Sequence, residues 1–332
     1  MKGTAVEVSA GLEERPKLSG PRSQITRFIL GNPLPLLLVI IVIFTIVFRP
    51  VFLSWTNFKN TIADASLLGI MGVAMTFIII ARGIDLSISS TMAITCVGVA
   101  ILHSKLGVPI VYAVVINLVI GIVIGVVIGL LITKISIPPF IASLGAMYSI
   151  LGVARLWSGA QAVGGLPKGF SQLWLGDFVG IPIPIWIWLL VVVLGLVIER
   201  HMTFGKYIYV IGANPKTARY SGVPVHSTYI KMFALSGLLA ALSGILSAAR
   251  FGSGEPLTGR GYEFLVITAV IVGGTSLVGG KGSTKGTILG ALIIAFLRTV
   301  MSFWGLRIYW QNFAIGLILI VMVWISVLRE ER

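Results

Sequence analysis

The residues of this chain that could do chemistry are few and far apart. The 332 residues include 11 acidic side chains, three histidines and one cysteine, Cys96. A lone cysteine cannot form a disulfide within the chain, and no cysteine cluster is present to hold zinc or an iron–sulfur centre. The histidines are widely spaced and fall in predicted loops. We therefore expect no catalytic residues, no metal ion, no cofactor bound by this chain and no enzymatic activity.

A glycine-rich segment at 274–283 is the candidate for a nucleotide-binding loop. Its Lys281 stands one place too late for the phosphate-binding pattern, and glycine follows it instead of serine or threonine. Small residues also let membrane helices approach one another closely, and Gly286 and Gly290 continue a small-residue spacing into the next apolar run. The segment therefore predicts close backbone packing and no nucleotide binding.

Acidic residues in or beside apolar runs are the next candidates. Asp64 lies about six residues into an apolar run, where a carboxylate is costly unless it faces a cavity or a partner. It either lines an aqueous path or sits at the interface, reaching water or pairing with Lys59. Asp85 lies at a predicted cytoplasmic edge between two runs. Capping of the next helix with a local pair to Arg82 is one interpretation, and a role in gating or partner contact is another.

Glu255 and Glu263 flank a short glycine-rich loop near Arg250 and Arg260. A glycosidase needs two carboxylates at a fixed separation, but here we favour salt pairing or contact with an external partner. Polarity and position together give a set of candidate pathway or gate residues: Asp64, Thr76, Asp85, Ser87, Gln161, Tyr262, Glu263 and Gln311.

The segment 212–224 predicts a short surface helix with both ends marked. Asn214 suits the N-cap and Pro215 the first helical position, while Gly222 and Pro224 end the helix. Tyr220 is its one large apolar side chain, which is too little for a helix lying on lipid, so we favour docking against another protein. The candidate docking residues are Gly212, Asn214, Pro215, Ala218, Arg219, Ser221 and Gly222.

The elements that position these residues follow from composition. The chain is 57% hydrophobic and only 11% charged, whereas an average soluble domain carries about 25% charged residues. This composition excludes a soluble protein, and the abundance of Leu, Ile and Val excludes disorder. The net charge of +14 is best read as a topology signal, and we expect no nucleic-acid partner.

About ten apolar runs are long enough to predict transmembrane helices in an all-α polytopic membrane protein. A majority of basic residues falls on one side if both termini are cytoplasmic. Residues 1–30 then form a cytoplasmic tail and residues 31–332 the transmembrane domain, in which the run 262–279 could be broken or re-entrant. The runs are 34–49, 58–81, 86–102, 108–132, 138–157, 183–199, 228–249, 262–279, 284–301 and 309–328.

Four stretches in order along most of the chain resemble one family, the permeases of bacterial ABC importers of the ribose, xylose, arabinose and galactose type. They are GIDLS at 83–87, PPFIASLG at 138–145, the 212–222 segment with LSG at 235–237, and GYE at 261–263 followed by GGTSL at 273–277, GGKG at 279–282 and GT at 286–287. No single motif would suffice, but their order is specific.

The resemblance implies a permease subunit in the bacterial inner membrane that forms the pathway of an ATP-driven importer for a monosaccharide or related small polar solute. It implies a second permease subunit, the same or different, and cytoplasmic subunits that use the ATP. It also implies a periplasmic or lipid-anchored solute-binding protein, with membrane lipids around the assembly. The 212–222 helix would be the element that couples to the ATP-binding subunits.

Three departures from the family pattern leave the substrate open. Arg82 and Ser89 stand where the family commonly has glycine, and Leu265 where it commonly has aspartate. Related permeases move nucleosides, branched-chain amino acids or a furanose signal. The competing class is an ion-coupled secondary transporter, which needs paired intramembrane acids or broken helices; Asp64 is the one clear intramembrane acid in the sequence.

Overall fold

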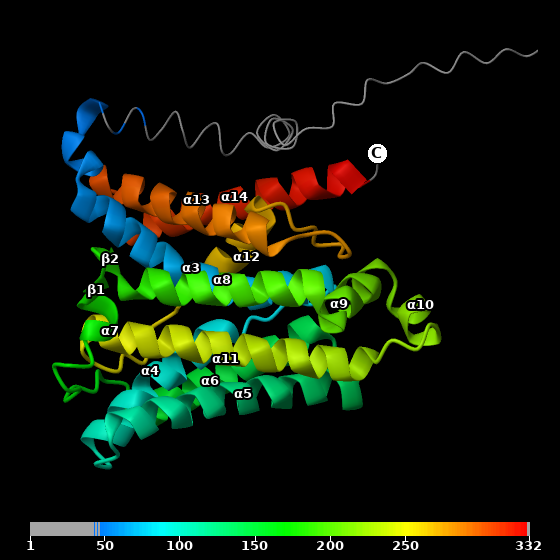
Figure 1. The fold of residues 1–332 in the computed structure, drawn as a ribbon, viewed down its shortest axis with the longest axis horizontal. Helices are drawn as coiled ribbons and strands as arrows, with labels where there is room; N and C mark the ends of the chain where they lie inside the picture. The colour runs from blue at the N-terminus through cyan, green and yellow to red at the C-terminus, as the bar shows by residue number, and fades with distance from the viewer. Residues whose placement is uncertain (1–42, 44, 46, 331–332) are drawn as a thin grey trace, which may run out of the picture.

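The protein is a bundle of α-helices, described by a computed structural model for residues 43, 45 and 47–330 (Figure 1). The predicted tail 1–30 and most of the run 34–49 lie outside these residues. A short 3-10 helix, η1 (Pro50–Leu53), leads into the bundle. The helices are α3 (Trp55–Ile80), α4 (Ile88–Ser104), α5 (Ile110–Lys134), α6 (Pro139–Ser158), α7 (Gln172–Leu175), α8 (Ile183–His201), α9 (Thr203–Ala213), α10 (Pro215–Tyr220), α11 (Val225–Phe251), α12 (Tyr262–Val272), α13 (Thr284–Phe303) and α14 (Ile308–Glu330).

The two ends of the bundle differ, as Figure 1 shows. At one end, here called the hairpin end, strands β1 (Asp177–Phe178) and β2 (Ile181–Pro182) pair antiparallel beside α7. At the other, the α10 end, helices α9 and α10 project beyond the long helices. Helix α3 runs the length of the bundle between these ends and therefore connects them.

Each of the nine predicted runs from 58 onward holds one helix. Seven helices of the described chain are long and apolar enough to cross a membrane, and α4 and α12 are shorter apolar helices. The run 262–279 is broken, as its glycines suggested, because helix α12 ends at Val272 and residues 273–283 form a loop. Gly274 and Gly279 adopt φ of 92° and 93°, a left-handed conformation that a continuous helix cannot contain.

Burial separates the central helices from the peripheral ones. The most apolar window of α3 is 89% buried and that of α11 is 78% buried, whereas those of α6 and α14 are 17% buried. The peripheral helices are nevertheless apolar on their exposed surface, with side chains such as Val111, Leu156 and Ile320. An apolar exterior around an apolar core is the arrangement expected of helices that face lipid or another membrane subunit.

Glycines allow the closest helix contacts. A Cβ at Gly121 or Gly125 of α5 would overlap backbone carbonyls of α11, and the same is true of Gly237 against α5. Between α13 and α12, a Cβ at Gly286 or Gly290 would likewise overlap backbone oxygens. The predicted close packing around the glycine-rich segment is therefore confirmed, and it follows the small-residue rule for membrane helices.

Two helices begin inside the bundle. The non-helical segment 252–261 runs along α4, since a Cβ at Gly254 would meet Ala100 near the C-terminal end of α4, and one at Gly259 would meet Met92 and the Ser89 carbonyl near its start. Helix α12 starts only after this inward run. Irregular backbone at such depth is tolerated where protein buries it or where it lines a cavity. The N-terminal turns of α4 and α12 therefore lie within the helical core.

Candidate functional site

Helix α10 forms as the sequence predicts. The Asn214 side chain accepts hydrogen bonds from the backbone N–H groups of Lys216 at 3.0 Å and Thr217 at 3.1 Å, and Pro215 occupies the first turn. Gly222 has φ of 78° just after the helix, which favours glycine. The capped helix therefore needs no partner to hold its ends.

The face that α10 presents differs from the predicted one. Ala218 is fully buried against the core and Gly212 packs beneath the segment, so neither is available for docking. A small residue at 218 lets the short helix lie close to the bundle, which is why it faces inward. The remaining predicted positions Asn214, Arg219, Ser221 and Gly222 are exposed and Pro215 is half-buried; Lys216, Thr217 and Tyr220 are also exposed.

Arg82 ties the end of α3 to this segment. Its Nε donates to the Gly212 carbonyl at 2.6 Å and its Nη2 to the Ala213 carbonyl at 2.7 Å. These are carbonyls at the C-terminal end of α9, where a cation is favoured. The predicted pair between Arg82 and Asp85 is therefore wrong, because the guanidinium points to α9 instead.

The loop 273–283 completes this junction. Gly280 N–H donates to the Ile80 carbonyl at 2.8 Å, and the Tyr209 hydroxyl of α9 donates to the Gly282 carbonyl at 2.8 Å. Burial, with a smaller effect of Glu199, raises the pKa of Tyr209, so its phenol keeps the proton it donates. Gly212 has no room for a Cβ between Ile80 and Gly280. The segment 209–213, the end of α3 and this loop thus form one packed unit.

Asp85 is deeply buried rather than at an edge. Its carboxylate accepts from the Ser87 N–H at 2.9 Å, from the Ser87 hydroxyl and from the Ser236 hydroxyl at 2.7 Å. Ser236 lies near the middle of α11, so the loop 81–87 dips into the bundle. The Asp85 side chain is 1% exposed and fully occupied, and it fastens this loop to α11 instead of capping the first turn of α4.

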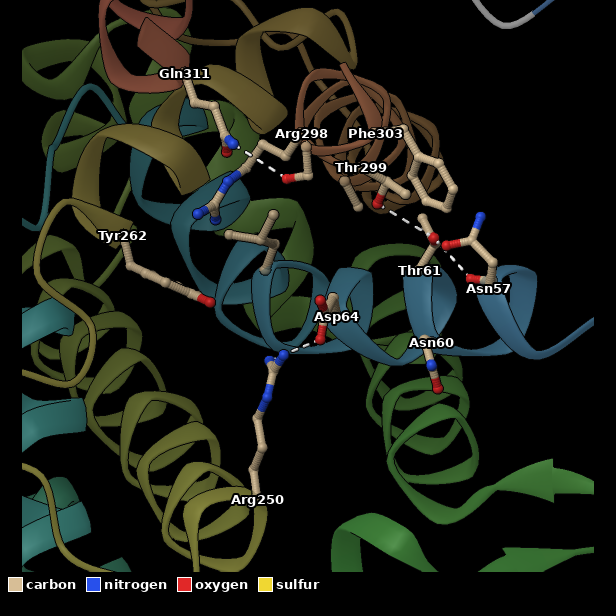
Figure 2. Close-up of a pocket in the computed structure, with 13 residues that line it drawn as sticks. Asn57, Asn60, Thr61, Asp64, Arg250, Tyr262, Arg298, Thr299, Phe303 and Gln311 are labelled. Atoms are coloured by element: carbon tan, nitrogen blue, oxygen red, sulfur yellow. Dashed lines mark hydrogen bonds and ion pairs between the residues drawn. The ribbon is translucent and has the colours of Figure 1, made fainter. Parts of the chain in front are cut away.

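A cavity of about 330 Å³ near the start of α3 brings together Asp64, Tyr262 and Gln311 (Figure 2). Asp64 forms an ion pair with Arg250 at 2.7 Å, so the expected pairing with Lys59 is wrong. Gln311 donates to the Ser302 hydroxyl at 3.1 Å and to the Leu306 carbonyl at 3.0 Å. Three of the candidate pathway residues, separated widely in sequence, thus share one polar cavity.

Sequence reasoning missed several lining residues of this cavity. On α3, polar side chains recur at the spacing of one helix face within an otherwise apolar run, a pattern that predicts an aqueous surface. Opposite them, α13 contributes a second polar group, and Thr61 and Thr299 share a hydrogen bond at 3.2 Å. The missed residues are Asn57, Asn60, Thr61, Arg298, Thr299 and Ser302.

Two further cavities continue from the first along the residues 257–263. One of about 320 Å³ shares Arg250 and Tyr262 with the first cavity. The other, of about 430 Å³, shares Thr258 and Arg260 with the second and is lined by Glu263. Because neighbouring cavities share lining residues, the candidates Asp64, Gln311, Tyr262 and Glu263 lie along one series of adjoining cavities.

Of the two alternatives given for Glu255 and Glu263, salt pairing is wrong, and contact with an external partner stays a prediction. Among the described residues, the ion pair within 4.0 Å joins Arg250 to Asp64, and none involves Glu255 or Glu263. Glu255 is instead 3.5 Å from the Ser253 hydroxyl that donates to it. The short loop keeps both carboxylates away from the guanidinium groups beside them in sequence.

The other candidate pathway residues do not line these three cavities. Thr76 is fully buried and shares a hydrogen bond with Thr287 of α13. Ser87 is buried and bonded to Asp85. Gln161 is exposed in the loop after α6. In the described structure, Thr76 therefore joins α3 to α13, Ser87 bonds within the loop that precedes α4, and Gln161 is exposed.

Comparison with known proteins finds a match over residues 57–323 to the family described as branched-chain amino acid transport system/permease component. The chain is 39% identical over 302 residues to the probable ABC transporter permease protein YphD of Escherichia coli K12, covering 89% of this chain and 90% of that protein. It is 35% identical over 307 residues to the ribose import permease protein RbsC of Haemophilus influenzae, covering 90% and 94%. It is 31% identical over 288 residues to the D-allose transport system permease protein AlsC of Escherichia coli K12, covering 87% and 88%. No solved structure matches the chain.

Proposed function

Because the chain belongs to the branched-chain amino acid transport system/permease component family, we propose that it forms the membrane pathway of an ATP-driven ABC importer for a monosaccharide. Relatives named as ribose and D-allose permeases, each matched over most of both chains, support a monosaccharide over a branched-chain amino acid. The chain performs no chemistry, and the energy comes from ATP used by partner subunits.

The position of α10 is the observation that carries this proposal. The helix projects from the bundle (Figure 1), its ends are capped, and it exposes Lys216, Arg219 and Tyr220. Arg82 connects this segment to the end of α3, and α3 begins at the cavity that contains Asp64. A displacement of α10 can therefore be transmitted along α3 to the cavities.

In the proposed assembly, the α10 end faces the cytoplasm and docks on ATP-binding subunits. The hairpin end faces the outside, where a solute-binding protein delivers the sugar. A second permease subunit pairs with this one in the bacterial inner membrane. ATP binding moves the α9–α10 segments, and the helices around the cavities open alternately to the two sides, as in other hinge and shear transitions.

The test is a charge reversal on α10. In the double variant Lys216→Glu/Arg219→Glu, two cations meant to face the ATP-binding subunit become anions, so we expect at least a tenfold loss of affinity for that subunit, measured by co-purification and titration in detergent. Membrane insertion should be normal, because neither side chain is buried. Reversal of one exposed cation near α7, Lys168→Glu, serves as the control and should leave docking unchanged. Docking that survives the α10 reversal would contradict the coupling assignment.

A further inference from the structure

The carboxylate of Glu263 is buried beside a cavity, and one of its oxygens accepts no hydrogen bond from the described residues. The Glu263 side chain is 7% exposed, and its Oε2 has no hydrogen-bond partner in the described structure. It lies in the first turn of α12 and lines a cavity of about 430 Å³ with Ser89, Ser90, Arg155, Thr258 and Arg260. Buried polar atoms without partners are rare and costly, and each one requires an explanation.

The two arginines of this cavity do not satisfy the carboxylate. Within the described residues, no ion pair of 4.0 Å or less joins Glu263 to Arg155 or Arg260, although all three line the same space. A carboxylate and guanidinium groups that share a cavity without touching leave both acceptor and donor capacity free. A molecule that both donates and accepts hydrogen bonds can fill that gap.

We propose that the Glu263 cavity binds a neutral polyol, a monosaccharide ring, inside the permease. This inference rests on the proposed function and places the substrate. The Glu263 carboxylate accepts from sugar hydroxyls, and the two guanidinium groups donate to hydroxyl and ring oxygens. Ser89 and Ser90 donate to backbone carbonyls at 3.3 Å and 2.9 Å, which leaves their oxygens free to accept.

The surroundings suit such a ligand in size and electrostatics. A volume of 430 Å³ falls within the range of about 300–1,000 Å³ found for small-molecule sites. The first turns of α4 and α12 both reach this cavity, and helix N-termini favour electron-rich groups such as a carboxylate or a hydroxyl oxygen. A monosaccharide has enough hydroxyls to use many of these polar groups, and the relatives named as ribose and D-allose permeases favour it over an amino acid.

The experiment measures ligand binding to the full chain in lipid nanodiscs, with D-ribose, D-allose and L-leucine as probes. We expect at least one of the two sugars to bind, Glu263→Gln to weaken it by at least tenfold, and L-leucine not to bind. Asp177→Asn, which removes an exposed carboxylate outside the three cavities, should bind like the wild type. Equal binding by Glu263→Gln, binding of L-leucine, or no binding of either sugar to the wild type would overturn the proposal.

A stability measurement separates a ligand-binding role from a structural one. Replacing an unpaired buried carboxylate by an amide removes a charge that the fold does not satisfy, so Glu263→Gln should unfold at a temperature no lower than the wild type. Lost binding with a large drop in unfolding temperature would indicate a structural role instead. The proposed function can fail independently of this inference. Sugar binding would then depend on Glu263, but the assembled transporter would show no ATP-driven uptake.

Discussion

At the scale of single residues, Arg82 combines an uncommon backbone conformation with a contact between two elements. It has φ of 65°, a left-handed conformation in which glycine is favoured. Its two hydrogen bonds to the Gly212 and Ala213 carbonyls offset that backbone cost. The residue therefore serves to hold the α9–α10 segment against the end of α3.

Replacing this residue should separate coupling from folding. In Arg82→Gly the backbone is relaxed and both side-chain hydrogen bonds are lost, so we expect sugar uptake per ATP hydrolysed to fall several-fold while ATP-binding subunits still dock. Arg82→Lys, which keeps the charge but can replace only part of the forked contact, should be intermediate. The ratio is measured in proteoliposomes that contain the whole transporter. An unchanged ratio in Arg82→Gly would show that this contact does not transmit movement.

Residue patterns predicted local contacts better than distant ones. The capping by Asn214 depends on residues within three positions of it, and the sequence was sufficient to predict it. The partners of Asp85 and Asp64 were missed, because Ser236 and Arg250 lie more than a hundred residues away in the chain. The sequence around a polar residue does not indicate which distant side chain will bind to it in the folded protein.

At the scale of elements, hydropathy located the helices, and the glycines of 262–279 indicated a possible break but not its position. The apolar residues of 262–279 continue through Leu277 and Val278, so a window of hydropathy extends past the end of α12 at Val272. Positive φ at Gly274, just after the end of α12, prevents the helix from continuing. A hydropathy average does not detect this change of backbone conformation. The inward course of 252–261 was likewise hidden, since its polar residues resemble an ordinary surface loop.

Helix packing gives a matched pair of glycine substitutions. A side chain at Gly125 of α5 would collide with the Phe233 carbonyl of α11, whereas Gly316 of α14 has open space around it. We therefore expect Gly125→Leu to lose most folded protein, measured as the monodisperse fraction in size-exclusion chromatography and as the unfolding temperature. Gly316→Leu should resemble the wild type. Equal behaviour of the two variants would mean that α5 and α11 do not pack as closely as described.

At the scale of the whole molecule, the sequence-based prediction of an ABC permease is confirmed by the family match and by relatives aligned over most of the chain. Seven described helices are long enough to span a membrane; the number ten and the side on which each terminus lies stay predictions. The low charge content first excluded a soluble protein. The long apolar helices suit a membrane, and the cavities between them suit the proposed pathway across it.

The two ends of the molecule have different roles in the proposed transporter. Three adjoining cavities run from near the hairpin end into the bundle, the α9–α10 segment projects at the other end, and α3 with Arg82 joins them. In the proposed transporter, the chain supplies the pathway and the coupling surface, while the energy source and the delivery of substrate come from partner chains.

The most direct test is uptake of radiolabelled D-ribose and D-allose into proteoliposomes that contain this chain, its ATP-binding subunits and its solute-binding protein. We predict uptake of at least one sugar that requires ATP and both partners and that is indifferent to an imposed proton or sodium gradient. Uptake by this chain alone, driven by such a gradient, would contradict the account.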